Sequence, residues 1–231
     1  MHTALEIINR WREVRRQIDQ AASDCGRNPE EITLVAVSKT YPAQDVRTLA
    51  QAGHRDFGEN YVQEALDKVA ALADLPLYWH FIGRLQTNKA KYLPGRFELI
   101  HSLDRIKTAQ VLDQRCAQKG LHQSVLLQVN MAGEEQKGGI GDADLLDAAR
   151  HINALPHLDV QGLMCMPPFF DDPEKARPFF AQLAYIRDQL QDKLGKRLRH
   201  LSMGMSGDYR AAIEEGSTLL RIRTSIFGPR T

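Results

Sequence analysis

The residue whose position most favours chemistry is a lysine that follows an apolar run. Lys39 comes directly after Leu34–Ser38, a Leu-Val-Ala-Val-Ser segment typical of a strand buried in a parallel sheet. Removing an ammonium group from water lowers its pKa, and a neutral lysine amine is a nucleophile for carbonyl groups. Two interpretations follow. Either Lys39 forms a Schiff base, or its side chain extends along the protein to reach solvent.

A segment of small residues near the C-terminal end could bind an anion. Ser202–Asp208 reads Ser-Met-Gly-Met-Ser-Gly-Asp, in which Ser206 can donate its hydroxyl and Gly207 leaves room for a ligand. Phosphate sites in α/β barrels commonly use the loops after the seventh and eighth strands. The alternative is an ordinary turn, because glycine and serine dominate turns.

Two arginines alternate in the last apolar segment. Arg221 and Arg223 are two residues apart, so on a strand their side chains point to the same face. An arginine inside a closed sheet needs an acceptor, such as a pyridine nitrogen. Arginine keeps its proton, so a pyridine facing it would stay unprotonated and be a poorer electron sink. The alternative is pairing with surface carboxylates.

Other motifs give weaker evidence for a binding site. Lys137–Gly141 is rich in glycine but lacks the spacing of a P-loop, and we interpret it as a loop in which Lys137 could still reach an anion. His80 lies within an expected strand and is most simply a hydrogen-bonded core histidine. No His, Cys or Asp cluster has the spacing of a metal site, so we expect no metal.

Apolar runs with strand character alternate with runs of helical periodicity along the chain. The expected strands are 33–38, 56–59, 78–82, 98–102, 124–129, 160–165, 200–203 and 219–226. The expected helices are 3–26, 46–52, 61–72, 89–93, 106–118, 144–154, 173–194 and 208–215.

This alternation predicts a single (β/α)8 TIM-type barrel, with a doubly wound open sheet as the alternative. The pattern places no helix after the eighth strand. The first helix, 3–26, is the extra one and is expected to cover the barrel wall there. No linker or repeat divides the chain, so residues 1–231 are expected to form one domain.

Composition narrows the class of protein. The formal net charge is +1, from 30 basic and 29 acidic residues, which gives no argument for nucleic acid or an anionic membrane. The 3 cysteines lack the spacing of a disulfide framework. No stretch approaches the roughly 20 apolar residues of a membrane span, and the N-terminus lacks a signal-peptide core. A cytoplasmic location is expected.

The motifs together resemble a known family, the pyridoxal phosphate homeostasis proteins (the YggS/PROSC or PLP-binding protein family), whose barrel is similar to the N-terminal domain of alanine racemase. The resemblance covers nearly the whole chain. The matching segments are Leu34–Lys39, Phe57–Glu64, Trp79–Lys89, Gly162–Met166, Leu201–Ser206 and Ile226–Gly228.

The resemblance implies that pyridoxal 5′-phosphate (PLP) forms a Schiff base with Lys39. It implies that Ser206, the Thr224 hydroxyl and backbone N–H groups near residues 223 and 224 hold the phosphate. Arg221 would face the pyridine nitrogen, with Asn60 and Met203 near the ring. One position departs from the family pattern, because Arg223 stands where glycine is usual. Glycine permits close approach of a backbone to phosphate.

The same resemblance implies a PLP carrier in vitamin B6 homeostasis, with PLP-dependent apoenzymes as candidate recipients. The alternative is an amino-acid racemase. Alanine racemases carry a second domain that supplies a catalytic tyrosine, and this sequence ends soon after Phe227-Gly228. Racemisation needs an acid/base group on each face of the substrate carbon. We therefore expect no turnover and no catalytic residue, and a monomer or weak homodimer.

Overall fold

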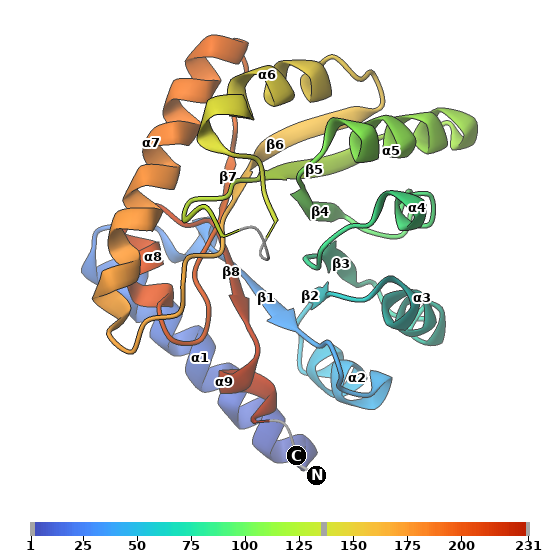
Figure 1. Ribbon diagram of the computed structural model, residues 1–231. Helices are drawn as coiled ribbons and strands as arrows, with labels where there is room; N and C mark the ends of the chain where they lie inside the picture. Colours follow the sequence, from blue (N-terminus) through green and yellow to red (C-terminus); the bar gives the residue numbers. More distant parts are fainter. Residues whose placement is uncertain (1–2, 135–137, 230–231) are drawn as a thin grey trace.

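The structure, a computed structural model, describes residues 3–134 and 138–229. Its parallel strands pair in chain order and close into a barrel, β1 through β8, surrounded by helices (Figure 1). The predicted (β/α)8 fold is confirmed. The strands are β1 (Thr33–Val37), β2 (Asp56–Glu59), β3 (Tyr78–Phe81), β4 (Leu99–Leu103), β5 (Gln123–Gln128), β6 (Leu158–Met164), β7 (His200–Ser202) and β8 (Leu219–Ile222).

Capping residues mark the ends of several helices. Thr3 and Glu6 form a capping box at the start of the first helix, and Gly120 and Gly195 end two others in the left-handed conformation. The helices are α1 (Ala4–Asp24), α2 (Ala43–Gln51), α3 (Val62–Ala71), α4 (Thr87–Ala90), α5 (Ile106–Lys119), α6 (Asp142–Asn153), α7 (Arg177–Leu194), α8 (Tyr209–Glu214) and α9 (Thr224–Phe227), with 3-10 turns η1 (Pro29–Glu31) and η3 (Pro173–Ala176).

The end of the barrel differs from the prediction. The expected strand 219–226 stops at Ile222, and the short helix α9 follows it. β8 pairs with β1 from Leu219 to Ile222 and has no further partner beyond that point. Phe227 then stacks on Tyr41, with ring centroids 4.9 Å apart, which places it in the layer outside the barrel. The expectation that no helix follows the last strand was therefore wrong.

The extra N-terminal helix covers this part of the barrel. α1 packs against α2, α8 and α9, and Figure 1 shows it running beside α8 and α9. Its buried residues are Ile7, Val14, Ile18 and Ala22, which are seven, four and four residues apart and so lie on one face of the helix. The predicted position of this helix is confirmed.

Two apolar layers hold the fold. The larger layer lies between the strands and the helices and includes the fully buried rings of Phe57, Phe81 and Phe180. A smaller separate cluster is formed by Val35, Leu99, Leu126, Met164 and Leu219, from alternate positions of five strands. Because all strands are parallel, their carboxyl ends meet at one rim, above this inner cluster.

Candidate functional site

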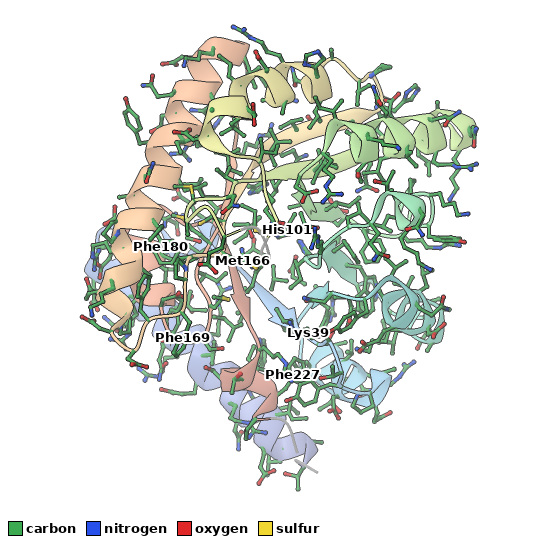
Figure 2. The ribbon with its side chains drawn as sticks, viewed as in Figure 1. Lys39, His101, Met166, Phe169, Phe180 and Phe227 are labelled. Atoms are coloured by element: carbon green, nitrogen blue, oxygen red, sulfur yellow. The ribbon has the colours of Figure 1, made fainter. Side chains whose placement is uncertain are left out.

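A cavity of about 430 Å³ lies at the carboxyl ends of the strands. Its walls come from the segments that follow β1, β2, β3, β6, β7 and β8. Figure 2 shows Lys39 beside the end of β1, with Met166 and Phe169 on the segment after β6. The lining residues are Val37, Lys39, Asn60, Ile82, Met166, Pro168, Phe169, Phe170, Asp171, Pro173, Ala176, Met205, Ser206, Gly207, Asp208, Arg221, Arg223 and Thr224.

The cavity brings together nearly all the residues that the sequence singled out. Lys39, Asn60, Ser206, Gly207, Arg221, Arg223 and Thr224 all line it. Met203 does not, because its side chain is fully buried in the larger apolar layer, and Met205 lines the cavity instead. Lys137 lies outside the described residues.

Lys39 stands in the turn that follows β1. β1 ends at Val37, Ser38 is fully buried, and Lys39 is half-buried against the cavity. Thr40 follows with φ of 70°, a left-handed conformation that non-glycine residues seldom adopt. The lysine is thus held between a buried serine and a conformationally restricted threonine.

A buried carboxylate lies beside this turn. Glu59, the last residue of β2, is fully buried and accepts a hydrogen bond from Ser38 Oγ at 2.6 Å. The ammonium group of Lys68 on α3 lies 2.7 Å from the same Oε1 atom. Burial raises the pKa of Glu59, and the nearby ammonium opposes that shift.

Arg221 reaches the cavity from inside the barrel, where it is almost fully buried. Its Nη1 donates to Ser202 Oγ at 2.5 Å and its Nη2 donates to the Cys165 carbonyl at 2.9 Å. Burial lowers the pKa of the guanidinium. No carboxylate forms an ion pair with Arg221 among the described residues, so its charge is available to a ligand acceptor in the cavity.

Arg223 stands just past β8, where its backbone and side chain contact different segments. Its N–H donates to Ser206 Oγ at 3.4 Å. Its Nη2 donates to Thr40 Oγ1 at 3.3 Å, and its guanidinium carbon lies 5.1 Å from the centre of the Tyr41 ring. The side chain therefore extends toward the turn after β1, while the backbone N–H remains beside Ser206.

The described residues offer neither a metal-binding cluster nor a reactive thiol beside Arg221. No group of three or more His, Cys, Asp or Glu side chains in residues 3–134 and 138–229 could hold a metal ion. Cys165 is fully buried in the larger apolar layer, and burial raises the pKa of its thiol to about 12, so the thiol stays protonated. No described helix has the length and apolar character needed to cross a membrane.

Comparison with known proteins identifies the family. The family described as "Alanine racemase, N-terminal domain" matches residues 11–231. A protein of Aquifex aeolicus named "Pyridoxal phosphate homeostasis protein" is 46% identical over 226 residues, which cover 98% of this chain and 99% of that protein. The protein of the same name from Pseudomonas aeruginosa is 47% identical over 218 residues, covering 94% and 93%. The chain belongs to the pyridoxal phosphate homeostasis protein family.

A solved member of the same fold carries the cofactor. The structure of PipY from Synechococcus elongatus with PLP bound is 37% identical to this chain, with a TM-score of 0.86. The match covers 96% of this chain and 100% of PipY. The resemblance seen in the sequence motifs is confirmed at the level of family and fold.

Sequence reasoning missed one wall of the cavity and one buried residue beside the turn that carries Lys39. The first is the segment after β6, where Phe169 is 88% exposed at the cavity and Phe170, Asp171 and Pro173 also line it. Its Pro-Pro-Phe-Phe sequence could have marked it as a loop with unburied aromatic side chains. The second is Lys68, which lies in the middle of a helix and carries no local signal that its ammonium group is buried.

Proposed function

We propose that this member of the family binds PLP in the cavity, holds it on Lys39 as a Schiff base, and serves intracellular PLP homeostasis without catalytic turnover. The whole chain then acts as one cofactor-binding barrel domain. The names of the relatives and the PLP-bound structure of PipY support this proposal. PLP-dependent apoenzymes are the proposed recipients, the cytoplasm the proposed location, and a monomer or weak homodimer the proposed state.

One observation carries the proposal. A single cavity contains a lysine amine, a buried arginine without an ion-pair partner among the described residues, and two hydroxyl groups. PLP has an aldehyde, a pyridine nitrogen and an anionic phosphate, and each matches one of these. The aldehyde suits Lys39, the nitrogen suits Arg221, and the phosphate suits Ser206 and Thr224.

Each residue has a distinct proposed role. When bound, PLP supplies an aldehyde that an amine can capture covalently. Ser206, Gly207 and the N–H of Arg223 lie together after β7 and β8 and would bind the phosphate, with Thr224 adding its hydroxyl. Asn60 lines the cavity from the segment after β2. Met203 lies in the larger apolar layer and does not line the cavity, so it would influence the ring only through the residues that pack against it.

The arginine at position 223 does not prevent this arrangement. Its side chain contacts Thr40 and Tyr41, while its N–H lies beside Ser206. The long 3.4 Å contact of this N–H with Ser206 Oγ can be exchanged for a bond to a phosphate oxygen, as the N–H of the usual glycine would allow. The guanidinium adds positive charge at the edge of the same cavity.

An amino-acid racemase is the alternative. It would need an acid/base group opposite Lys39, and the candidates among the described lining residues are Asp171 and Asp208. Burial raises the pKa of Asp208, while its Oδ1 accepts a hydrogen bond from the Met205 N–H at 2.6 Å. Conversion of either alanine enantiomer by the purified protein, lost in Lys39→Ala, would support this alternative.

The decisive experiment maps the reduced adduct. The protein is mixed with PLP, reduced with borohydride, digested, and analysed by mass spectrometry. The pyridoxyl mass is expected on the peptide containing Lys39 and absent in Lys39→Ala. Lys193→Ala, which removes an exposed lysine on α7, is the control and should retain the adduct. An adduct on another lysine in the unmodified protein would refute the assignment.

A further inference from the structure

The turn that carries Lys39 is held by side chains that do not line the cavity. They are Glu59 at the end of β2 and Glu64 and Lys68 on α3, and we call these three residues the Lys68 clamp. Lys68 is buried, with 7% of its side chain exposed, and it bridges the two carboxylates. A lysine is seldom buried to this extent unless its charge is paired.

The ammonium group of Lys68 has all three of its donors engaged. It donates to Glu59 Oε1 at 2.7 Å, to Glu64 Oε1 at 2.8 Å and to the Ser38 carbonyl at 2.7 Å. The last of these bonds is to the backbone of the residue immediately before Lys39. The clamp therefore fixes the entry to the turn directly.

The exit from the turn is fixed by the same group of residues. The Thr40 N–H donates to Glu64 Oε1 at 2.5 Å. Thr40 is the one non-glycine residue with positive φ among residues 3–134 and 138–229, and such a conformation is unfavourable for a residue with a Cβ atom. A charge-assisted bond to its N–H offsets that cost and holds the backbone in this conformation.

We propose that the Lys68 clamp positions Lys39: by fixing the backbone on both sides, it sets the direction in which the amine enters the cavity. Glu59, Glu64 and Lys68 are thus positioning residues for the covalent bond to the cofactor. The inference rests on the proposed function, because it concerns how Lys39 meets a carbonyl group. The clamp contacts the turn after β1, whereas the phosphate residues follow β7 and β8. Thr40 Oγ1 accepts from Arg223 Nη2, but the group proposed for the phosphate is the Arg223 backbone N–H, so the clamp should affect covalent capture and leave phosphate binding nearly unchanged.

Two ligands separate these effects. PLP can react with Lys39, whereas pyridoxine 5′-phosphate carries an alcohol in place of the aldehyde and can bind only non-covalently. The test variant is Glu64→Ala, since Glu64 is partly exposed and its loss leaves the buried Glu59–Lys68 pair intact. Asp74→Ala is the matched control, because Asp74 is an exposed carboxylate that pairs with Arg47 on α2.

In Glu64→Ala, we expect the affinity for PLP to fall roughly tenfold, the size of effect expected for one charge-assisted hydrogen bond. The affinity for pyridoxine 5′-phosphate should stay within about twofold of the unmodified protein, and Asp74→Ala should leave both affinities unchanged. In the PLP-free protein, the Thr40 amide should exchange its hydrogen faster in Glu64→Ala. The inference is overturned if PLP affinity does not change, or if both ligands weaken equally.

A second variant tests the buried half of the clamp. Lys68→Met alone would leave Glu59 buried without its cation, and the protein could fail to fold for that reason. Glu59→Gln/Lys68→Met removes both charges together. We expect this variant to fold, to bind pyridoxine 5′-phosphate normally, and to lose PLP affinity. Full PLP affinity in a folded double variant would overturn the inference, and failure of the unmodified protein to bind either ligand would instead refute the proposed function.

Discussion

His80 Nδ1 lies 2.9 Å from His101 Nε2 in the interior of the barrel, so one ring donates a hydrogen bond to the other. Both rings belong to a longer chain. His101 Nδ1 lies 2.8 Å from Ser202 Oγ, which accepts from Arg221. At the other end, His80 Nε2 lies 3.2 Å from Asp56 Oδ1. A continuous set of hydrogen bonds thus connects the cavity arginine to a carboxylate at the opposite end of the strands.

When both rings are neutral, the two ends of this chain fix the direction of every hydrogen bond in it. Arg221 can only donate, and an ionised Asp56 can only accept. His80 must then donate from Nε2, so its Nδ1 accepts from His101 Nε2. The His101 Nδ1 atom in turn accepts from the Ser202 hydroxyl. Burial lowers the pKa of His101 well below its usual value, with His80 and Arg221 acting in the same direction, in agreement with a neutral ring.

The first prediction concerns these tautomers. In their neutral forms, both His80 and His101 should carry the hydrogen on Nε2. Nitrogen-15 NMR of labelled protein distinguishes the two tautomers by the chemical shifts of the ring nitrogens. Ser202→Ala should change the His101 shifts, because it removes the donor to Nδ1. A hydrogen on Nδ1 of either ring in the unmodified protein would mean that the hydrogen bonds do not run from Arg221 toward Asp56.

The sequence predicted the barrel because its strands and helices carry strong, regular apolar patterns. The limits of the elements were harder to predict. Thr224–Phe227 has the composition of a strand, but β1 offers no pairing partner beyond Ala36, and the segment coils into α9. The end of β8 therefore depends on where β1 ends, and the sequence of residues 219–226 alone does not predict it.

In the candidate site, too, local sequence patterns predicted some residues, whereas others depend on contacts between distant segments. Lys39, Ser206 and Arg221 were predictable because each follows or occupies an apolar segment, and the ends of such segments meet at one rim of a barrel. Lys68 was not, because its position on α3 resembles that of any solvated helical lysine. Its role arises from a contact with Ser38, which is 30 residues away in sequence.

The second prediction concerns Ser206, which lies at the cavity and is half-buried. Ser206→Ala removes a hydroxyl that can donate to an anionic phosphate, and a hydrogen bond to a charged group contributes about 1.5–3 kcal/mol. We expect PLP affinity to fall about tenfold or more, measured by fluorescence titration. Ser23→Ala, at an exposed serine of α1, should leave it unchanged. Equal PLP affinities in the two variants would show that Ser206 does not bind the phosphate.

The third prediction concerns acid stability. Burial lowers the pKa of His54 from 6.5 to about 4, with smaller opposing effects from Asp56. In the unfolded chain His54 becomes protonated below pH 6.5, whereas in the folded protein it becomes protonated only below about pH 4. Stability should therefore fall by up to about 3 kcal/mol across this interval on account of His54, and no further below it.

His54→Gln tests this contribution, because glutamine can still donate to the Asp56 carbonyl that lies 2.9 Å from His54 Nε2. The free energy of unfolding in urea, measured at several pH values, should depend less steeply on pH between 6.5 and about 4 in the variant. Parallel curves for the two proteins would show that His54 is protonated in the folded state at its ordinary pKa.

The fourth prediction concerns the backbone beside Asn60. A Cβ atom at Gly83 would lie 2.0 Å from the Asn60 carbonyl oxygen, and backbone cannot move away as a flexible side chain can. Gly83→Ala should therefore destabilise the protein by about 1–3 kcal/mol, the range for an overpacked site. Because Asn60 lines the cavity, PLP affinity should fall as well. Gly141→Ala, where no atom lies within 4 Å of the new Cβ, is the control. A stable Gly83→Ala protein would mean that the β2 and β3 ends separate easily.

The fifth prediction separates ligand binding from folding at one glycine. A Cβ atom at Gly207 would meet no protein atom within 4 Å, and its φ lies outside the left-handed region, so Gly207→Ala should fold as well as the unmodified protein. Gly207 nevertheless lines the cavity beside Ser206. If the phosphate lies against this backbone, a methyl group will obstruct it, and the affinities for PLP and pyridoxine 5′-phosphate should fall together, by roughly tenfold. Gly141→Ala should bind both ligands normally. Normal binding by Gly207→Ala would place the phosphate elsewhere in the cavity, and Arg223 with Thr224, just past β8, would then be its remaining donors.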